Sequence, residues 1–264
     1  MAFATDTGKL AAVSRAILDV SWRRLLCAAT DVLFPPACVN CANGIEAPDD
    51  TIQLCPPCRR AFVDPTPPCR FCGADLAEGI NPDGRCGRCR GVRFRFSAIV
   101  RLGKYEGGLQ PAILRAKQSI NVAIAIHLGR LLAEVRYEEL ARLGADAVIA
   151  APAFWTRQGK HGHNSADVLA MEVAHRLRLP IAEHLVVRTR ATRPQAELTP
   201  PQRRNNVRNA FAVRPHRDLP GAKILLVDDV LTTGSTANEV AKALLKAGAE
   251  SVDVAVLART VGGK

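Results

Sequence analysis

The sequence has no uninterrupted apolar stretch approaching the ~18 residues that a helix needs to cross a lipid bilayer. The N-terminus also lacks the order of a secretory signal peptide, because Asp6 and Asp19 interrupt its apolar positions and Arg23–Arg24 follow them. Aromatic residues are scarce at 5%, but hydrophobic residues make up 48% of the 264 positions, which is typical of a globular chain. We therefore expect a cytoplasmic protein without stable membrane insertion.

Acidic residues are missing from one basic stretch and nearly missing from another. Seven basic residues and no acidic one lie between Arg85 and Lys104, and eight arginines accompany only Glu197 between Arg188 and Arg217. The formal net charge is +11 and the pI is about 9.6. This balance favours a polyanionic ligand, either nucleic acid or a phosphorylated metabolite, although a solvated surface explains each run equally well.

Eight of the nine cysteines form four Cys-x-x-Cys pairs within residues 38–89. Thirteen residues separate Cys41 from Cys55, and thirteen separate Cys72 from Cys86, so each half can form a hairpin that joins two pairs. Four thiolates at ~2.3 Å complete the coordination of Zn²⁺, and two structural zinc ions are predicted, although iron–sulfur clusters use the same ligands. The predicted ligands are Cys38, Cys41, Cys55 and Cys58 for one ion and Cys69, Cys72, Cys86 and Cys89 for the other.

Strand and helix patterns alternate after the cysteine region, which predicts an α/β fold with a parallel sheet flanked by helices. A first strand is expected to begin in the alternating Arg93-Phe94-Arg95-Phe96 and to continue to Val100. Its two phenylalanines share one face, where they pack in the core or stack on bases. The other predicted strands lie at 147–151, 224–227 and 252–258, and the predicted helices lie at 121–143, 165–179 and 233–247.

Composition divides the chain into three parts. Residues 1–33 predict a basic amphipathic helix that packs on the rest of the protein or lies on a membrane surface. Residues 34–92 are rich in Cys, Pro and Gly and predict a double zinc ribbon. Residues 93–264 contain the alternating strands and helices.

The most informative segment runs from Ile224 to Thr236, where an apolar strand ends in Asp228 and Asp229 and a hydroxyl-rich turn opens a helix. Backbone N–H groups at a helix start bind phosphate, and Gly234 lets the backbone approach it closely. The two carboxylates repel phosphate but accept hydrogen bonds from the hydroxyl groups of a sugar. The alternative explanation is helix capping, which accounts for one acid and one hydroxyl but not for two acids and four hydroxyls around a glycine. The predicted ribose 5′-phosphate site consists of Asp228, Asp229, Thr232, Thr233, Gly234, Ser235 and Thr236.

This segment resembles the phosphoribosyl pyrophosphate (PRPP) signature of type I phosphoribosyltransferases. With the cysteine pairs, the chain resembles the ComF family, which is associated with competence and DNA uptake and includes GntX-type proteins. Similar segments are also Lys104-Tyr105-Glu106-Gly107, the basic loop that starts at Arg188, and the closing Leu257-Ala258-Arg259.

The resemblance implies a type I phosphoribosyltransferase fold with a five-stranded parallel core. It also implies that PRPP binds with Mg²⁺ and that Asp228 and Asp229 are the catalytic residues. A loop after the 147–151 strand and a flexible flap at 188–204 would bind pyrophosphate. The candidate residues of this loop and flap are Ala151, Arg157, Lys160, Arg188 and Arg190.

Two functions are compatible with these features. The first is a phosphoribosyltransferase that transfers phosphoribose from PRPP to an acceptor that the sequence does not name. The second is a non-enzymatic component of DNA uptake that works with competence and DNA-translocation proteins. In that case the ribbons and the basic surface, including Arg85, Arg88 and Arg90, would bind single-stranded DNA.

Overall fold

The computed structural model forms two compact units, one up to Cys55 and one from Pro56 onward. This division falls inside the segment predicted as one double ribbon, and the boundaries drawn from composition stay a prediction. Within the described part of the chain, no helix is both long and apolar enough to cross a bilayer. The helix predicted at 1–33 lies outside the described residues. The described residues are 35–45, 51–76, 85–152, 164–193, 198–214 and 219–260.

Four parallel strands form the main sheet in the order β1-β6-β5-β2, which confirms the predicted parallel α/β architecture. Ile99, Val254, Leu226 and Ile149 form one row across all four strands and are buried in the same core cluster. A short antiparallel pair, β3 and β4, lies outside this sheet. The strands are β1 (Ile99–Lys104), β2 (Ala147–Ala150), β3 (Val186–Arg188), β4 (Phe211–Val213), β5 (Lys223–Leu231) and β6 (Ser251–Arg259).

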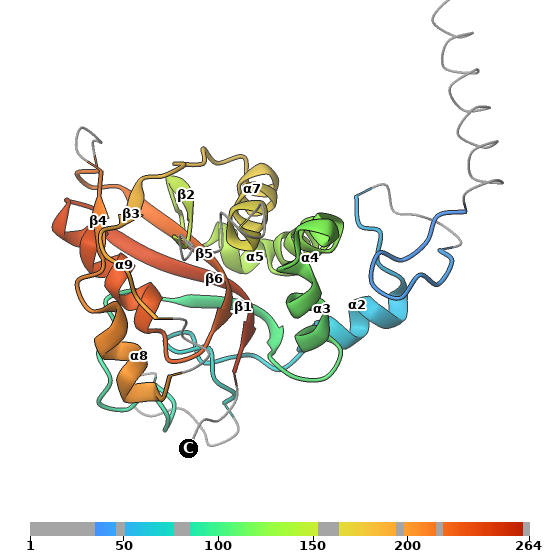
Figure 1. Ribbon diagram of the computed structural model, residues 1–264, viewed down its shortest axis with the longest axis horizontal. Coiled ribbons are helices and arrows are strands. Elements are labelled where there is room, and N and C mark those ends of the chain that lie inside the picture. Colours follow the sequence, from blue (N-terminus) through green and yellow to red (C-terminus); the bar gives the residue numbers. More distant parts are fainter. Residues whose placement is uncertain are drawn as a thin grey trace, which may run out of the picture. The chain divides into compact units, whose positions relative to one another are not determined.

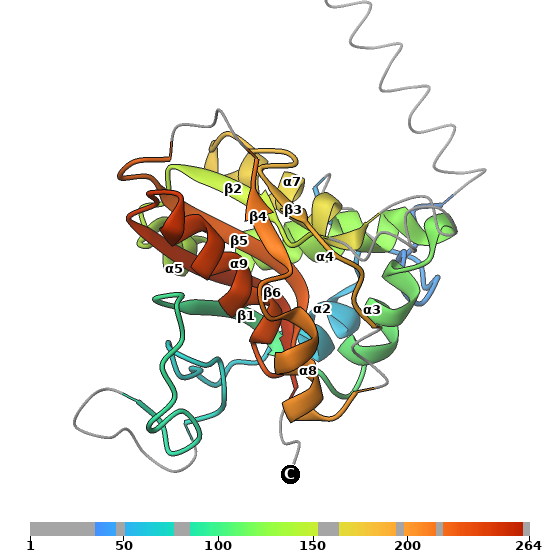
Figure 2. The same cartoon turned by 60° about the vertical axis from the view of Figure 1, so that its left-hand side comes forward.

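Helices cover both faces of the main sheet (Figures 1 and 2). On one face α7 packs against β2 and β5, and α4 lies against α7. On the other face Val240 and Leu244 of α9 join the core cluster, and α8 packs against α9. The helices are α2 (Pro56–Phe62), α3 (Leu109–Ala116), the 3₁₀ helix η1 (Ser119–Asn121), α4 (Val122–Val135), α5 (Tyr137–Ala141), α7 (Ser165–Leu177), α8 (Pro200–Val207) and α9 (Ser235–Lys246).

Capping residues set the ends of α7 and α9, the two helices that begin near the carboxyl edge of the sheet. Helix α7 begins after Asn164, whose side chain accepts a hydrogen bond from the N–H of Ala166, and it ends at Arg178 in the left-handed conformation. Helix α9 begins after Gly234, whose φ of 75° suits a residue without Cβ. The helices predicted at 165–179 and 233–247 are therefore confirmed with slightly shorter bounds.

The first predicted strand begins six residues late. The segment with Phe94 and Phe96 is not a strand, and β1 starts at Ile99. The N–H of Arg95 donates to the side-chain oxygen of Asn238 on α9 at 2.8 Å, so it is not free to join a strand ladder. The two aromatic rings stack on each other with centroids 4.7 Å apart.

The helix predicted at 121–143 breaks into α4 and α5 at Arg136. The guanidinium of Arg136 donates to the backbone carbonyls of Arg101 and Asp64, and these bonds hold the chain where the two helices meet. Periodicity did not reveal the break because apolar positions continue on both sides of it.

The expected fifth strand of the core is reduced to a single bridge between Ile181 and Val148. Val148 donates its N–H to the carbonyl of Pro180 and accepts a hydrogen bond from the N–H of Ala182. Pro180 has no N–H of its own, and His184 takes a left-handed conformation that turns the chain away. The described part of the sheet therefore has four strands and this bridge.

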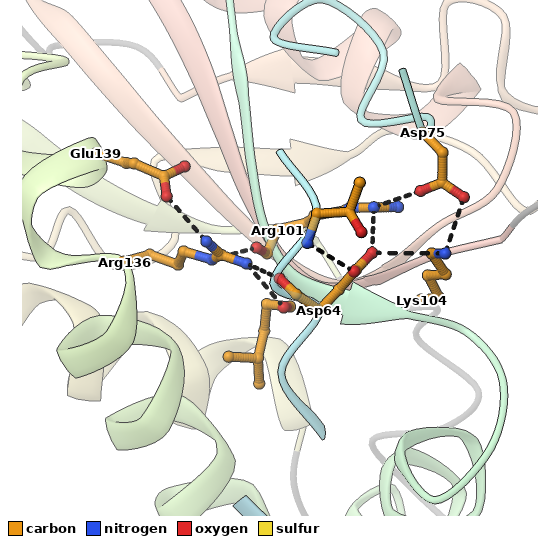
Figure 3. A network of polar contacts seen from close by, with 8 residues as sticks. Asp64, Asp75, Arg101, Lys104, Arg136 and Glu139 are labelled. Atoms are coloured by element: carbon orange, nitrogen blue, oxygen red, sulfur yellow. Dashed lines mark hydrogen bonds and ion pairs between the residues drawn. The ribbon is translucent and has the colours of Figure 1, made fainter. Parts of the chain in front are cut away.

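The second zinc ribbon is the segment that carries Cys69, Cys72, Cys86 and Cys89. A buried ion-pair network joins it to the sheet (Figure 3). Arg101, in the middle of β1, has no exposed surface, and its Nη2 lies 2.6 Å from a carboxylate oxygen of both Asp64 and Asp75. The ammonium of Lys104 lies 3.1 Å from Asp75. A buried guanidinium requires such partners because its desolvation is costly. The network thereby fixes Asp75, next to the second cysteine group, on the sheet.

We predict that Arg101→Met lowers the free energy of unfolding by about 3 kcal/mol or more, because Asp64 and Asp75 then lose their shared partner. Urea denaturation of the metal-loaded protein measures this loss. Arg142→Gln is the matched control, since Arg142 forms an exposed ion pair with Glu138 and should change stability by less than about 0.5 kcal/mol. Equal losses in the two variants would contradict a special role for the buried network.

Candidate functional site

A hydroxyl-rich loop connects the carboxyl end of β5 to the start of α9. The hydroxyl oxygens of Thr233 and Ser235 lie 2.6 Å apart, and Thr233 also accepts a hydrogen bond from the N–H of Ser235 at 3.3 Å. Thr232 and Thr236 are half-buried on either side. The first N–H groups of a helix lack intrahelical acceptors, and the helix dipole favours an anion beside them. The loop therefore has the chemistry of a phosphate site.

Asp228 and Asp229 lie near the end of β5, and Val230 and Leu231 separate them from this loop. Successive strand residues point to opposite faces, and the two carboxylates accordingly have different partners. The Oδ2 atom of Asp229 lies 2.9 Å from Nζ of Lys117 and accepts a hydrogen bond from the hydroxyl of Ser165 at 3.0 Å. Asp228 accepts a hydrogen bond from the N–H of Asp229 and interacts electrostatically with Arg188.

The pKa of Asp228 is shifted strongly. Burial, reinforced by the neighbouring carboxylate of Asp229, raises it from 3.8 to about 7, although Lys117 and Arg188 oppose the change. Such a carboxyl is half ionised near neutral pH, and a carboxyl of this kind in a ligand crevice is typical of a functional site.

Lys117 and Ser165 are site residues that sequence reasoning missed. Lys117 follows the last turn of α3, and Ser165 is the first residue of α7, so both are far from β5 in sequence. The helix predicted at 165–179 included Ser165, but its pattern did not connect that hydroxyl with Asp229, and no motif marked Lys117. Only the packing of α3 and α7 around the sheet edge brings them to Asp229.

The loop after β2 lies beside the same edge. Ala151 is buried, and its N–H donates to the carbonyl of Val227, so the loop starts next to the acid pair. Its carbonyl accepts a hydrogen bond from the side chain of Asn164, and Arg188 donates to the carbonyl of Pro152 at 3.4 Å. The other predicted pyrophosphate residues, Arg157 and Lys160, lie outside the described residues.

The predicted flap begins at Arg188, which also donates to the hydroxyl of the buried Thr192 and lies over the ring of Phe211. Arg190 is engaged differently, because its guanidinium donates to the carbonyls of Asn206 and Arg208 at the end of α8. The structure thus brings Arg188 to Asp228 and places the hydrogen bonds of Arg190 on α8. Their roles toward a ligand stay predictions.

The eight paired cysteines form two groups with the predicted composition. In each group all four ligand atoms lie within 4.8 Å of one another. The first group consists of Cys38, Cys41, Cys55 and Cys58, and the second consists of Cys69, Cys72, Cys86 and Cys89.

The sulfur positions fit a tetrahedral zinc ion. With Zn–S bonds of ~2.3 Å, two sulfur ligands should lie about 3.8 Å apart. The distance is 3.8 Å from Cys69 to Cys89, 3.8 Å from Cys86 to Cys89, and 3.4 Å from Cys72 to Cys86. Each group is therefore a four-cysteine zinc-binding site, and such closed sites are structural.

The thiols of the second group compete for protons. Burial favours the neutral thiol at Cys69, but backbone N–H groups outweigh it and lower its pKa to about 7. Burial raises the pKa of Cys72, and the neighbouring thiol of Cys86 adds to this. A divalent cation removes the conflict because it stabilises all four thiolates together.

Family comparisons agree with both parts of this description. A double zinc ribbon domain matches residues 29–90, and a phosphoribosyl transferase domain matches residues 164–263. The fold and the cysteine groups therefore define a protein with a type I phosphoribosyltransferase fold that follows a double zinc ribbon.

Whole-length relatives narrow this class to one family. Competence protein F of Haemophilus influenzae is 31% identical over 227 residues, which cover 84% of this chain and 96% of that protein. DNA utilization protein YhgH of Escherichia coli K12 is 33% identical over 211 residues, which cover 79% of this chain and 91% of that protein. The chain belongs to the ComF family.

Solved structures are similar at a lower level. Purine phosphoribosyltransferase from Pyrococcus horikoshii is 20% identical, with a TM-score of 0.31 over 61% of this chain and 77% of that chain. At this score the similarity adds nothing to the assignment.

We predict that Asp228→Asn raises the melting temperature at pH 8. The carboxyl has a pKa of about 7 in the folded protein and about 3.9 when unfolded. Its ionisation therefore destabilises the fold fully above pH 7, and the penalty disappears as the pH falls toward 4. The difference in melting temperature between the two proteins should shrink steadily as the pH falls from 8 to 5. A constant difference across that range would contradict the shifted pKa.

Proposed function

We propose that the chain binds PRPP with Mg²⁺ at the carboxyl edge of the sheet and transfers its phosphoribosyl group to an acceptor. The observation that carries this proposal is the adjacency of Asp228 and Asp229 to the loop that opens α9. One part of this edge suits a sugar diol and the other suits a phosphate, and only Val230 and Leu231 separate the two parts in the chain.

The 5′-phosphate would lie at the start of α9. Backbone N–H groups and the hydroxyls of Thr233 and Ser235 supply donors there, and Gly234 adopts the left-handed conformation that turns the chain from the loop into the helix. The hydrogen bond between the two hydroxyls, at 2.6 Å, holds them side by side in the free protein. A phosphate would therefore meet a cluster of donors that already exists.

The ribose hydroxyls would donate to Asp228 and Asp229. Lys117 and Ser165 hold the Asp229 carboxylate in place, so little reorganisation is needed when a diol arrives. Mg²⁺ usually binds through one or two carboxylates together with substrate phosphates, and this acid pair offers that donor set. When bound, the ion would neutralise part of the charge on pyrophosphate.

The pyrophosphate would lie over the loop at Ala151 and Pro152, opposite Arg188. Breaking the bond between C1 of ribose and the pyrophosphate oxygen builds negative charge on the leaving group. Arg188, together with the predicted loop residues Arg157 and Lys160, would stabilise that charge. The flap that begins at Arg188 would exclude water when it closes.

Isothermal titration with PRPP and Mg²⁺ tests this proposal. We predict that Asp229→Asn weakens binding about tenfold or more, because hydrogen bonds to charged groups contribute roughly 1.5–3 kcal/mol. Asp146→Asn is the matched control, since Asp146 is exposed and lies just before β2, at the opposite edge of the sheet. Absence of wild-type binding at millimolar PRPP, or equal affinity of both variants, would contradict the proposal.

A second function, binding of single-stranded DNA, has its own support. The names of the two relatives refer to competence and DNA utilization, and the second ribbon carries exposed arginines, among them Arg88, Arg90 and Arg93. Under this proposal the chain would act in the cytoplasm with competence and DNA-translocation proteins. Reducing conditions there keep zinc-bound thiolates intact.

We predict that Arg88→Gln and Arg90→Gln each weaken binding of a single-stranded oligonucleotide and lower its salt dependence. Each lost phosphate contact should reduce the slope of log K against log salt by about 0.7. Fluorescence anisotropy at several salt concentrations measures the slope, with Arg142→Gln as the exposed control. An unchanged slope in both ribbon variants would exclude this surface.

A further inference from the structure

Arg259, near the end of β6, makes hydrogen bonds on two sides. Its Nε donates to the carbonyl of Cys72 at 2.8 Å, within the second zinc site. Its Nη1 donates to the carbonyl of Leu231 at 3.1 Å and to the carbonyl of Thr232. A single guanidinium therefore connects a zinc-binding turn to the loop between β5 and α9.

A second contact joins the same two regions. The stacked rings of Phe94 and Phe96 cover Gly234, where an added Cβ would lie 3.4 Å from Cε1 of Phe94. Phe94 packs against the core cluster of the sheet and also against the cluster that contains Cys69 and its partners. The loop that opens α9 thus rests on a side chain that the second zinc site also supports.

The backbone of the ribbon lies directly on the sheet. The N–H of Ile99 donates to the carbonyl of Arg70 at 2.7 Å. A Cβ on Gly73 would lie 3.2 Å from Cγ2 of Ile99 and 3.6 Å from Cδ of Arg259. Glycine at position 73 therefore lets the cysteine turn lie close against Ile99 and Arg259.

The second ribbon depends on its metal for these positions. Its described buried cluster consists of four cysteines and Ala74, and Phe71, Leu76 and Phe94 pack against it while only partly buried. Such a small apolar cluster favours a fold that depends on its metal. Four thiolates and one Zn²⁺ carry a net charge of about −2, which favours a guanidinium nearby. Without the ion, the turn that presents the carbonyl of Cys72 loses its anchor.

We propose that Arg259 is a positioning residue. Through it, metal bound at the second zinc site orders the loop between β5 and α9. Its effect on ligand affinity rests on the proposed PRPP function, whereas its effect on loop order does not. The forked guanidinium matters because it donates from Nε on one side and from Nη1 on the other, whereas lysine carries all of its donors on a single nitrogen. Lysine at this position would keep the charge and lose the connection.

Hydrogen exchange and titration with PRPP and Mg²⁺ test the proposal on Arg259→Lys, Arg259→Gln and the exposed control Arg142→Gln. We expect the amides of residues 231–238 to exchange about tenfold faster in both Arg259 variants, while the amides of β1 keep their protection. Zinc content should remain about two per chain by mass spectrometry. PRPP affinity should fall about tenfold, with no rescue by lysine.

A separate variant tests the metal directly. Cys72→Ser should lower the zinc content to about one per chain and speed exchange at residues 231–238 in the same way. If Cys72→Ser does not fold, the Arg259 variants still decide the question. Wild-type protection of this loop in Arg259→Gln, or rescue by Arg259→Lys, overturns the proposal. If the wild-type protein does not bind PRPP, the PRPP function fails, and the exchange data alone decide the coupling.

Discussion

In its described residues, the second ribbon buries little apolar surface besides its metal ligands, and this constraint explains much of the surrounding structure. Its buried cluster contains metal ligands and one alanine, so its fold depends on the ion and on polar bonds to the sheet. Arg101 on β1 binds Asp75, and Arg259 on the adjacent strand β6 binds the carbonyl of Cys72. Two neighbouring strands thus each contribute one arginine to the ribbon. The ribbon in turn provides part of the surroundings of the loop before α9.

Asp228 and Asp229 differ from these stabilising contacts, because ionised Asp228 lowers the stability of the folded protein. Burial and like charge make ionised Asp228 unfavourable, and its partners compensate only in part. A residue selected for stability alone would be neutral at this position. Asp229 is ordered by Lys117 and Ser165, which limits the reorganisation that a ligand would require. A carboxylate whose ionised form is unfavourable, next to one that is held in place, is typical of a binding or catalytic site.

The sequence predicted those features whose signals are local. Cysteine spacing gave both zinc groups, and strand–helix alternation gave the parallel sheet and the loop at Gly234. Features that depend on distant packing were missed. Lys117 reaches Asp229 only because α3 packs against β1 and β6. Arg136 stands where a periodic helix breaks and bonds to distant carbonyls. The alternating Phe94 segment suggested a strand, but contacts with α9 and Gly234 outweigh the β-pattern.

Fold alone does not decide between a PRPP-dependent reaction and DNA binding, but the chemistry of the two surfaces differs. Two carboxylates suit a ligand with a vicinal diol, and DNA has no 2′-hydroxyl to offer them. They would also repel the phosphates of a DNA strand that lay across them. A DNA strand would therefore bind elsewhere. The exposed arginines around Arg90 offer such a place, because residues 85–104 contain no acidic residue. The two functions thus require different surfaces of one protein, and neither excludes the other.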